Sequence, residues 1–312
     1  MPVNSRIKNT AIFNKHIFFC DILFVKKVIT VNQVKLPSYQ LPLVNEVNYL
    51  EDLKGELIHP NRLLPDLHVF IFVQSGQIDV IEENTHYTLT SGSYLFLHSG
   101  LNHWGTTEYQ PNTSWYYIHF FANKNTLTEE YYWTESPSII PEDTYHKSLT
   151  LPKTGRVAQP EYFSTRLQQI VDNRRNGALI QSLDCYQLFL ELYQQNKKTN
   201  RKPQVDKIVS KVQQLCQASQ HKLTSDEIAE FLHLNYAYIS NVFKKETGIT
   251  ISHYQNQLMI ERAIRLFNQT DLNITEVSEQ LDFPNPFYFS RVFKQVTGIS
   301  PSLYLKQRYR QS

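Results

Sequence analysis

The sequence predicts an α+β protein of two domains, in which an N-terminal β-barrel with two trailing helices is followed by an all-helical C-terminal domain. Two patterns lead to this prediction. Apolar residues alternate with a period of two between residues 48 and 123, whereas the last third of the chain has a helical period and contains one 16-residue unit twice. With 312 residues, 41% of them hydrophobic and 19% charged, the chain can form two separate cores.

Residues 1–40 form an N-terminal extension whose structure the sequence leaves open. Residues 17–31 are apolar, but Asp21, Lys26 and Lys27 interrupt them, and no small-residue cleavage site follows. The stretch is also too short to cross a bilayer, so we expect neither a membrane anchor nor a signal peptide. A strand pair that precedes the barrel and a poorly ordered extension remain as two interpretations.

The cysteines and the charges indicate the setting in which the protein works. Cys20, Cys185 and Cys216 match neither a disulfide framework nor a metal spacing, so a reducing cytoplasm is expected. The formal net charge is +2, with a slightly acidic excess in residues 1–196 and a weakly basic one in residues 203–312. Any binding to a polyanion should therefore depend on individually placed side chains more than on a large electrostatic attraction.

Residues 41–159 are predicted to form the barrel, because short apolar runs alternate with turn sequences. Ser75-Gly76 and Glu83-Asn84 are such turns. Many short strands with evenly spaced turns are typical of a small β-barrel or jelly roll. The expected strands are residues 69–73, 78–81, 87–89, 94–97 and 114–121, and residues 124–159 are expected to wrap irregularly out of the barrel.

Residues 92–104 (GSYLFLHSGLNHW) carry a resemblance to a known barrel family. They resemble the second sequence motif of the cupins, with His98 where that motif has a proline. This half-motif is common in proteins, and it agrees with the strand pattern. The resemblance implies a cupin-like barrel.

A metal ion is not expected in this barrel. A metal-binding cupin needs two histidines and a glutamate in its first motif, so that three or four ligands converge on one ion. The corresponding segment supplies His68 alone. His68 and His103 could meet at the barrel mouth, joined by Glu82 or His119, but lone imidazoles in an aromatic barrel more often form hydrogen bonds. We therefore expect no metal and no cofactor.

Aromatic and polar residues of the barrel predict a binding site for a small polar ligand. Rings of tryptophan and tyrosine stack on the C–H faces of a sugar, while arginine and histidine bond its hydroxyls. The alternative is that these residues only fill the barrel. The candidate ligand-binding residues are Arg62, His68, His103, Trp104, Trp115, Tyr117 and His119.

Two amphipathic helices are predicted at residues 160–176 and 178–196, separated by Asn176-Gly177. An antiparallel helix pair must bury its apolar stripes, either against its own barrel or against a second subunit. Both alternatives remain open, and we predict that this segment takes part in dimerisation. Residues 197–204 begin KKTNRKP, are basic and lack apolar residues, which is typical of a linker.

The C-terminal domain contains a duplication. Residues 239–254 (ISNVFKKETGITISHY) and 289–304 (FSRVFKQVTGISPSLY) align with an offset of 50, and nine of the 16 positions are identical. The first copy belongs to a unit at residues 223–248, where Thr224 or Ser225 is expected to cap a short helix. A three-residue turn and a second helix ending at Gly248 follow. Two short helices joined by such a turn make a helix-turn-helix.

Each second helix is predicted to bury one face and expose a small, polar, basic stripe. In the first unit Ile239, Val242 and Phe243 should point inward, because they are spaced for one helical face. A purely structural helical domain is the alternative, but it would not need matching polar stripes beside both cores. The residues expected to face DNA in the first unit are Ala237, Ser240, Asn241, Lys244 and Lys245.

The second unit, residues 274–298, repeats this plan with one extra residue in the turn and with Thr275 as the expected cap. Between the units, residues 252–268 are predicted to form one long helix that holds both recognition helices at a fixed separation. Such a strut is needed because major-groove faces recur about every 34 Å along B-DNA. The residues expected to face DNA in the second unit are Phe287, Ser290, Arg291 and Lys294.

The exposed residues suggest distinct roles at DNA. A guanidinium matches the O6 and N7 acceptors of guanine, so Arg291 is the preferred base contact, and Asn241 is expected to bind adenine or a phosphate. Phe287 could meet a thymine methyl group or complete the core. The phosphate contacts or helix caps are expected to come from Ser240, Ser290, Lys244 and Lys294.

The C-terminal hundred residues resemble the tandem helix-turn-helix domain of the AraC/XylS transcription regulators. The second unit carries a signature close to that family's pattern GF…YFSRxFKxxxGxxPxxY. Three positions depart from the family: His233 and Asp282 replace the usual turn glycine, and Met259 replaces an arginine of the connecting helix. The matching residues are Phe283, Tyr288, Phe289, Ser290, Arg291, Phe293, Lys294, Gly298, Pro301 and Tyr304.

The resemblance implies a cytoplasmic regulator of transcription that is not an enzyme. Its expected partners are double-stranded DNA at promoter half-sites, a small effector, a second copy of itself as a homodimer and, if it is an activator, RNA polymerase; no membrane is expected. A cupin-type metalloenzyme, such as an isomerase or dioxygenase with a helical appendage, is the alternative from another class. An architectural protein that bends DNA without an effector is a third.

Overall fold

The computed structural model describes residues 32–122, 129–132, 137–199 and 203–309, and it has an N-terminal sheet-rich domain and a C-terminal helical domain. Residues 1–31 of the extension, which include the predicted apolar stretch at residues 17–31, lie outside the described residues. Among the described residues, no helix is long and apolar enough to cross a membrane.

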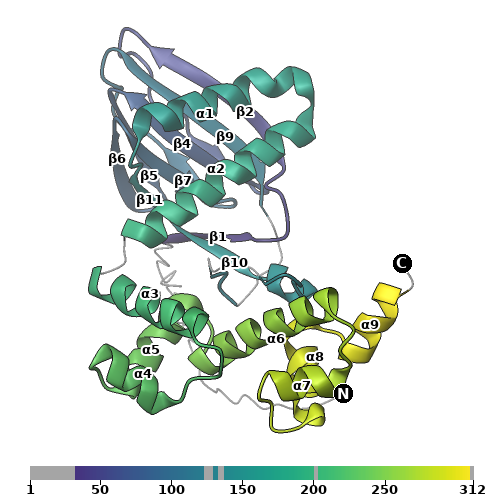
Figure 1. Ribbon diagram of the computed structural model, residues 1–312. Coiled ribbons are helices and arrows are strands. Elements are labelled where there is room, and N and C mark those ends of the chain that lie inside the picture. The colour runs from purple at the N-terminus through teal and green to yellow at the C-terminus, as the bar shows by residue number, and fades with distance from the viewer. Residues whose placement is uncertain (1–31, 123–128, 133–136, 200–202, 310–312) are drawn as a thin grey trace, which may run out of the picture. The chain divides into compact units, whose positions relative to one another are not determined.

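Eleven strands occur in the described part of the sheet-rich domain, in three antiparallel sheets (Figure 1). A five-stranded sheet has the order β11-β7-β4-β9-β2, a four-stranded sheet the order β3-β8-β5-β6, and β1 pairs with β10. The bounds are β1 (Gln33–Pro37), β2 (Val44–Asp52), β3 (Arg62–Leu63), β4 (Leu67–Ser75), β5 (Gln77–Glu82), β6 (Thr85–Thr90), β7 (Ser93–Leu97), β8 (Asn102–Trp104), β9 (Thr113–Phe121), β10 (Ser148–Pro152) and β11 (Thr154–Arg156).

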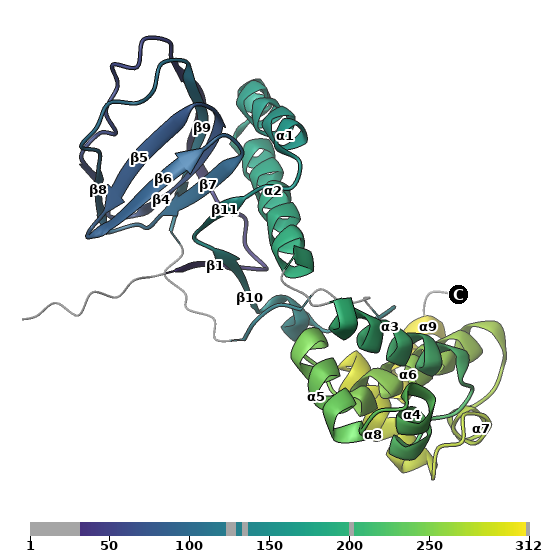
Figure 2. The ribbon, with the colours of Figure 1, turned by 90° about the vertical axis from the view of Figure 1, so that its left-hand side faces the viewer.

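Alternation along β4 divides the domain into two cores. Val69, Ile71 and Val73 face the four-stranded sheet and pack with apolar residues of β5, β6 and β7. Phe70 and Phe72 point to the opposite face and pack against the helices α1 (Pro160–Asp172) and α2 (Ala178–Thr199). Figure 2 shows both helices on one side of the five-stranded sheet, with β5 and β6 on the other. The period of two therefore placed the faces correctly, and the cupin-like barrel remains a prediction.

Three expectations for this domain need correction. The stretch after residue 123 was expected to be irregular, but β10 and β11 lie within it, because Leu149 and Leu151 are buried with the α2 core. The predicted first helix ends earlier, since residues Asn173–Asn176 form a 3₁₀ turn. Helix α2 runs on to Thr199, so the stretch expected as a linker from residue 197 begins as helix.

The stripes of the helix pair face the chain's own sheet. Phe163, Leu167 and Ile170 of α1 and Leu188 and Phe189 of α2 are buried in the core that the five-stranded sheet forms. Of the two alternatives that the sequence left open, burial against the chain's own domain accounts for these residues.

The described part of the helical domain has seven helices arranged as two clusters along α6 (Ile251–Gln269). The first half of α6 packs with the first helix-turn-helix and α3, and the second half packs with the second helix-turn-helix and α9. The predicted strut is thus one continuous helix that belongs to both cores. The other bounds are α3 (Pro203–Ala218), α4 (Ser225–Leu232), α5 (Tyr236–Thr247), α7 (Ile274–Gln280), α8 (Pro286–Thr297) and α9 (Pro301–Tyr309).

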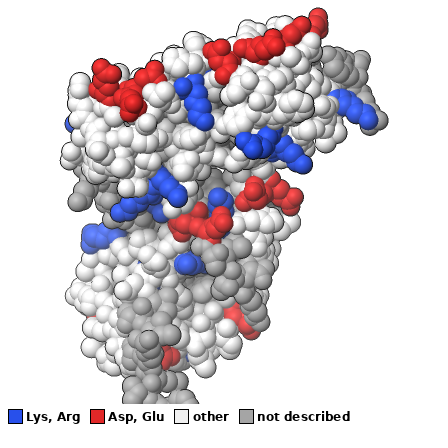
Figure 3. Space-filling model, turned by 90° about the horizontal axis from the view of Figure 1, so that it is seen from below, with Lys and Arg blue, Asp and Glu red and all other residues white. Residues whose placement is uncertain are grey.

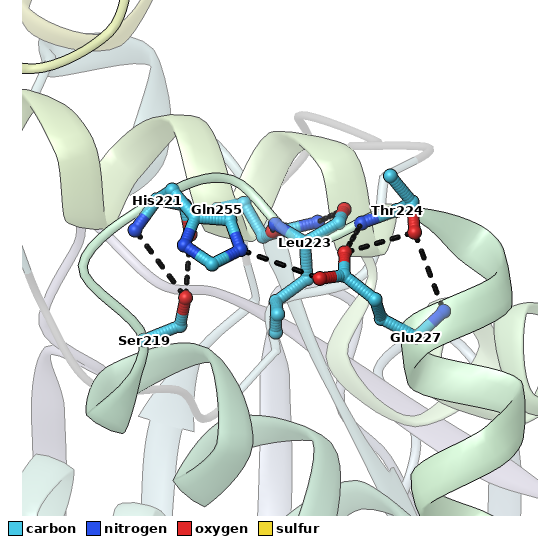
Figure 4. Close-up of polar contacts among 6 residues, drawn as sticks. All are labelled: Ser219, His221, Leu223, Thr224, Glu227 and Gln255. Atoms are coloured by element: carbon cyan, nitrogen blue, oxygen red, sulfur yellow. Dashed lines mark hydrogen bonds and ion pairs between the residues drawn. The ribbon is translucent and has the colours of Figure 1, made fainter.

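Side-chain hydrogen bonds fix the start of the first unit, as Figure 4 shows. Thr224 caps α4 by accepting from the Glu227 N–H, and the Glu227 carboxylate accepts from Thr224, which completes a capping box. The hydrogen bond from the Thr224 backbone N–H is also the main reason that the pKa of Glu227 lies below its usual value. Gln255 of α6, which is buried, bonds both backbone groups of Leu223 at 2.6 and 3.1 Å.

The second unit is capped differently from our expectation. Thr275 was expected to cap its first helix, but Asn273 is the N-cap of α7 and forms a capping box with Glu276. The amide side chain of Asn273 accepts from the N–H groups of Thr275 and Glu276, whereas Thr275 lies two residues further on, already inside the helix. The extra turn residue is confirmed: the left-handed Asp282 lies three residues before the N-cap Asn285, whereas His233 lies two before Asn235.

Met259 stands where the resemblance implies an arginine, and it is buried in the second core. A polar contact is still present on this helix, because Arg262, three residues later, donates to the carbonyl oxygens of Gln217 at 3.2 Å and of Ser219. The connecting helix therefore remains tied to the end of α3.

Candidate nucleic-acid interface and effector site

Helix α5 presents the predicted stripe on its solvent side. Ala237, Asn241, Lys244 and Lys245 are exposed and Ser240 is half-buried, while Ile239 and Phe243 are fully buried beneath them. Asn235 starts the helix by accepting from the Ala237 N–H at 2.9 Å, and Gly248 ends it with φ of 78°. A glycine suits this position because it adopts positive φ without a Cβ clash.

Helix α8 presents a different stripe on the same scaffold. Phe287 is 88% exposed, so it does not complete the core, and Arg291 and Lys294 are also exposed, with Ser290 half-buried. The Arg291 guanidinium lies 5.1 Å from the centre of the Tyr288 ring, one turn earlier on the helix. This contact restrains a long side chain that would otherwise sample many rotamers.

The charge around these helices is modest. In the face that Figure 3 shows, lysine and arginine side chains occur in small groups among acidic ones, and most of the visible surface carries neither. An arrangement of this kind can bind a phosphate backbone only through a few placed cations, as the composition indicated.

Inside the sheet-rich domain, three predicted ligand residues share one face. Trp115, Tyr117 and His119 of β9 pair in register with the inward residues of β4, and they point into the space between the two larger sheets. Across that space His103 of β8 lies opposite Arg62 of β3 in the antiparallel register, so both side chains are on the same side of the sheet. Burial, with smaller contributions from the charges of Arg62 and His119, lowers the pKa of His103 to about 4.

A carboxylate holds the β9 side of this cluster. His119 Nδ1 is 3.1 Å from Glu46 Oε2, and the Tyr117 hydroxyl donates to Glu46 Oε1 at 2.5 Å. Burial and the bond to Glu46 raise the pKa of Tyr117 to about 12, so the hydroxyl keeps its proton. Burial lowers the pKa of His119, against an opposing effect of Glu46.

Sequence reasoning missed two members of the cluster, His59 and Tyr109. His59 is buried, with Nε2 3.0 Å from His103 Nδ1 and Nδ1 3.0 Å from the Tyr109 hydroxyl. Both residues lie outside the named strands, where no alternation reveals which way a side chain points. The sequence shows only a histidine followed by Pro60, and this pattern predicts neither its burial nor its partners.

Two predicted ligand residues lie elsewhere. His68 is on the opposite face of β4, where Nδ1 accepts from the Ser99 N–H at 3.2 Å and the ring is 5.4 Å from that of Phe120. Trp104 directly follows His103 on β8 and therefore points to the other side of its sheet. His68 and His103 do not meet, because the five-stranded sheet carries His68 on the face toward the helices.

A second polar cluster closes another part of the domain. The Lys153 ammonium is buried, forms an ion pair with Glu82, and is 3.1 Å from His98 Nδ1. Burial lowers the pKa of Lys153 to about 8. Glu82 also accepts from the His98 N–H, so its position is set by internal partners. Among the described residues, no group of three or more His, Cys, Asp or Glu could hold a metal ion.

Comparison with known proteins agrees with the helical domain. A family model described as a helix-turn-helix domain matches residues 228–307. A regulator of Bacillus subtilis named as the uncharacterized HTH-type transcriptional regulator YisR is 27% identical over 262 residues, which is 81% of this chain and 90% of that protein. The arabinose operon regulatory protein of Escherichia coli is 24% identical over 233 residues, covering 73% of this chain and 76% of that protein.

Among solved structures, the C-terminal domain of AraT, a response regulator from Geobacillus stearothermophilus, is 32% identical and covers 35% of this chain and 88% of that one. Its TM-score of 0.31 is too low to bear on the fold. The full-length relatives are transcription regulators and not enzymes. The duplicated helix-turn-helix and these relatives show that the chain carries an AraC-type helix-turn-helix domain and is similar over most of its length to transcription regulators, among them the arabinose operon regulatory protein.

Proposed function

We propose that this regulator responds to a small polar effector that binds between the two larger sheets of the N-terminal domain. One observation carries the proposal: the buried His103 and His119 lie near the exposed Arg62, and His103 Nε2 has no hydrogen-bond partner among the residues that the structure describes. A buried polar atom without a partner costs free energy unless something satisfies it, and a ligand is a natural partner at a cluster of donors and aromatic rings.

The proposed DNA contacts come from α5 and α8 at successive half-site grooves. Arg291 would pair with guanine, Asn241 with adenine or a phosphate, and Phe287 with a thymine methyl group. The exposure of all three side chains supports these roles. Sequence-independent contacts to phosphates are assigned to Ser240, Ser290, Lys244, Lys245 and Lys294, with Ala237 allowing close approach.

We further propose that the protein acts as a cytoplasmic homodimer through the remaining surface of α2. Leu179, Ile180 and Leu183 are 72%, 41% and 51% exposed at the start of this helix, although its other side is buried in the domain core. Exposed leucines one turn apart are typical of a helix that packs against a partner. A Leu183→Glu variant should be monomeric in light scattering where the parent is dimeric, whereas Lys54→Glu, an exposed change away from α2 in the same domain, should leave the mass unchanged.

Effector binding can change transcription only if the effector binds two arrangements of the dimer with different affinity. The proposed result is a change in how the paired helical domains meet their half-sites, and, if the protein is an activator, in how they recruit RNA polymerase. An architectural protein would instead bind DNA with one affinity under all conditions.

The experiment uses the full chain. DNA sites are first selected from a random pool, and the affinity for the selected site is then measured by fluorescence anisotropy with and without each member of a panel of sugars and sugar acids. We expect at least one compound to change the affinity. The Arg62→Ala variant should lose that response and keep its basal DNA affinity, while Lys54→Ala, which removes an exposed charge of the same domain, should keep both. If a DNA site is selected but no compound of the panel changes the affinity for it, the effector proposal is contradicted.

A further inference from the structure

Three buried side chains form a hydrogen-bonded relay that ends at the proposed effector site. The Tyr109 hydroxyl is 3.0 Å from His59 Nδ1, and His59 Nε2 is 3.0 Å from His103 Nδ1. Tyr109, His59 and His103 are 5%, 8% and 3% exposed, so water does not substitute freely for these bonds. The far nitrogen, His103 Nε2, has no partner among the described residues.

The protons of this relay can be counted. Burial lowers the pKa of His59 to about 3 and that of His103 to about 4, so at neutral pH each ring is neutral and carries one N–H. Burial also raises the pKa of Tyr109, so its hydroxyl is protonated. With one proton on each of the three groups, only two directions of hydrogen bonding fit the two observed contacts.

In the first direction, Tyr109 donates to His59 Nδ1, His59 Nε2 donates to His103 Nδ1, and His103 Nε2 carries an N–H. In the second, His103 Nδ1 donates to His59, His59 Nδ1 donates to Tyr109, and His103 Nε2 is a bare acceptor. The second direction also leaves the buried Tyr109 O–H without an acceptor among the described residues, which adds a second unsatisfied group. Each such group costs about 1–3 kcal/mol, so the first direction is favoured.

The opposite side of the site has the complementary polarity. A carboxylate can only accept, so His119 must donate from Nδ1 to Glu46 Oε2, and a neutral His119 then has a bare Nε2 acceptor. Arg62 is exposed, forms no hydrogen bond or ion pair with another described residue, and adds a positive charge beside His103. The site thus has a cation and a donor on one side and an acceptor on the other.

We propose that Tyr109 and His59 are positioning residues that hold His103 as an Nε2–H donor, and that the effector is a small hydroxylated carboxylic acid. Its carboxylate meets Arg62 and His103, and a hydroxyl donates to His119. This inference rests on the effector site proposed above and names the chemical class of its ligand. A neutral sugar satisfies the hydroxyl contact but forms no charge-assisted hydrogen bond with the exposed Arg62, so we expect it to bind more weakly than the acid.

The relay can be tested without any ligand. Nitrogen-15 NMR of the full chain with labelled histidine distinguishes protonated from bare ring nitrogens, and the signals are assigned with His59→Gln and His103→Gln. We expect Nε2–H in both rings of the parent. Tyr109→Phe removes the donor to His59 and should shift both signals, whereas Tyr116→Phe, which removes a hydroxyl that donates to Gln168 on the helix-facing side of β9, should shift neither. An Nδ1–H tautomer at His103 in the parent overturns the relay.

The ligand class is tested by calorimetry with uronic and aldonic acids, each paired with its neutral parent sugar. At least one acid should bind at least about tenfold more tightly than its parent, as expected for a charge-assisted hydrogen bond. That preference should disappear in Arg62→Gln and weaken in Tyr109→Phe, and Lys54→Ala should retain it. If no acid exceeds its parent, the assignment fails. An acid that binds with this preference but leaves DNA affinity unchanged supports the ligand class and contradicts the regulatory proposal instead.

Discussion

The two domains place their functional polar groups in opposite ways. The helical domain exposes Asn241 and Arg291 over largely apolar cores, whereas the sheet-rich domain buries His59 and His103 between its sheets. An exposed group keeps its hydration and can be exchanged at little cost to stability, while a buried one needs an internal partner. The comparison teaches that DNA preference can vary on a constant helical scaffold, whereas changes at the proposed effector site should also change the stability of its domain.

The two helix-turn-helix units illustrate the first half of this statement. Phe243 and Phe293 occupy equivalent buried positions in the two cores, and Gly248 and Gly298 end both recognition helices. The surface positions differ: Asn241 becomes Arg291 at the same offset of 50. The cores therefore supply one framework for two different sets of contacts.

The largest expected effect comes from the shared cores. Phe293→Ala should lower the free energy of unfolding of the helical domain by about 3–5 kcal/mol, because a fully buried ring leaves a cavity. Trp104 and Trp115 lie on strands of the sheet-rich domain and residues 203–312 contain no tryptophan, so tryptophan fluorescence does not follow the helical domain, whereas circular dichroism mainly follows the helices. In urea the circular dichroism transition should move and the fluorescence transition should not.

Phe287→Ala is the matched control, since it removes the same ring from an 88% exposed position. It should change the free energy of unfolding by less than about 0.5 kcal/mol. Equal destabilisation by both variants would mean that the second recognition helix packs differently from the structure.

The helical framework was predictable from the sequence for a physical reason. Helix periodicity, the caps at Thr224 and Gly248, and the repeat at offset 50 are all local signals, and each agrees with the others. The start of α7 was misplaced because Asn273 and Thr275 are both good caps, and only the reciprocal bond with Glu276 decides between them. The DNA contacts themselves remain predictions, because exposure does not identify a base.

Base readout gives the next largest effect. Arg291→Ala should weaken binding to the selected site by about 1–3 kcal/mol and relax base preference at one position, because a bidentate guanidinium contact is lost. Asn241→Ala should change preference at a different position. Anisotropy titrations against sites with single base substitutions measure both. An equal loss on every sequence would contradict the assignment of Arg291.

Lys244→Ala provides the contrast within the same surface. A lysine that binds a phosphate contributes equally to all sequences and releases a counterion, so its removal should weaken every complex and reduce the salt dependence of binding by about one unit of slope. Altered base preference in this variant would show that Lys244 reads a base edge.

Acid should destabilise the sheet-rich domain through its buried histidines. In the folded domain the pKa of His103 is about 4, below its usual 6.5, so the unfolded chain binds more protons between these values. Stability is therefore complete above pH 6.5 and falls as the pH decreases toward 4. At pH 5 the loss from this group is at most about 2 kcal/mol. His103→Gln should reduce the difference between pH 7 and pH 5 in fluorescence-detected urea unfolding.

His86→Gln is the control, because the His86 side chain is 57% exposed and should contribute little to such a difference. An acid loss of the same size in His103→Gln and in the parent would show that other groups cause it.

The interior site was harder to predict than the surface stripes. Alternation along β9 placed Trp115, Tyr117 and His119 together, because a strand has a fixed period. Alternation could not show which side of the sheet His68 faces. Both faces of the five-stranded sheet are covered by apolar residues, so the sequence does not distinguish the face toward the helices from the face toward the other sheet. His59 and Tyr109 enter the cluster from outside the strands, where long-range packing alone decides direction.

The smallest expected effect distinguishes the turns of the two units. His233 and Asp282 have φ of 53° and 54°, a region where a Cβ costs about 1–2 kcal/mol, and aspartate tolerates it better than histidine. Glycine removes that cost but loses about 0.5–1 kcal/mol of chain entropy, so His233→Gly should stabilise the helical domain by about 0.5–1 kcal/mol and Asp282→Gly by less. His233→Ala keeps the Cβ and should give no gain in circular-dichroism unfolding. If Ala and Gly stabilise equally, the relevant change is loss of the imidazole, and the turn itself is unstrained.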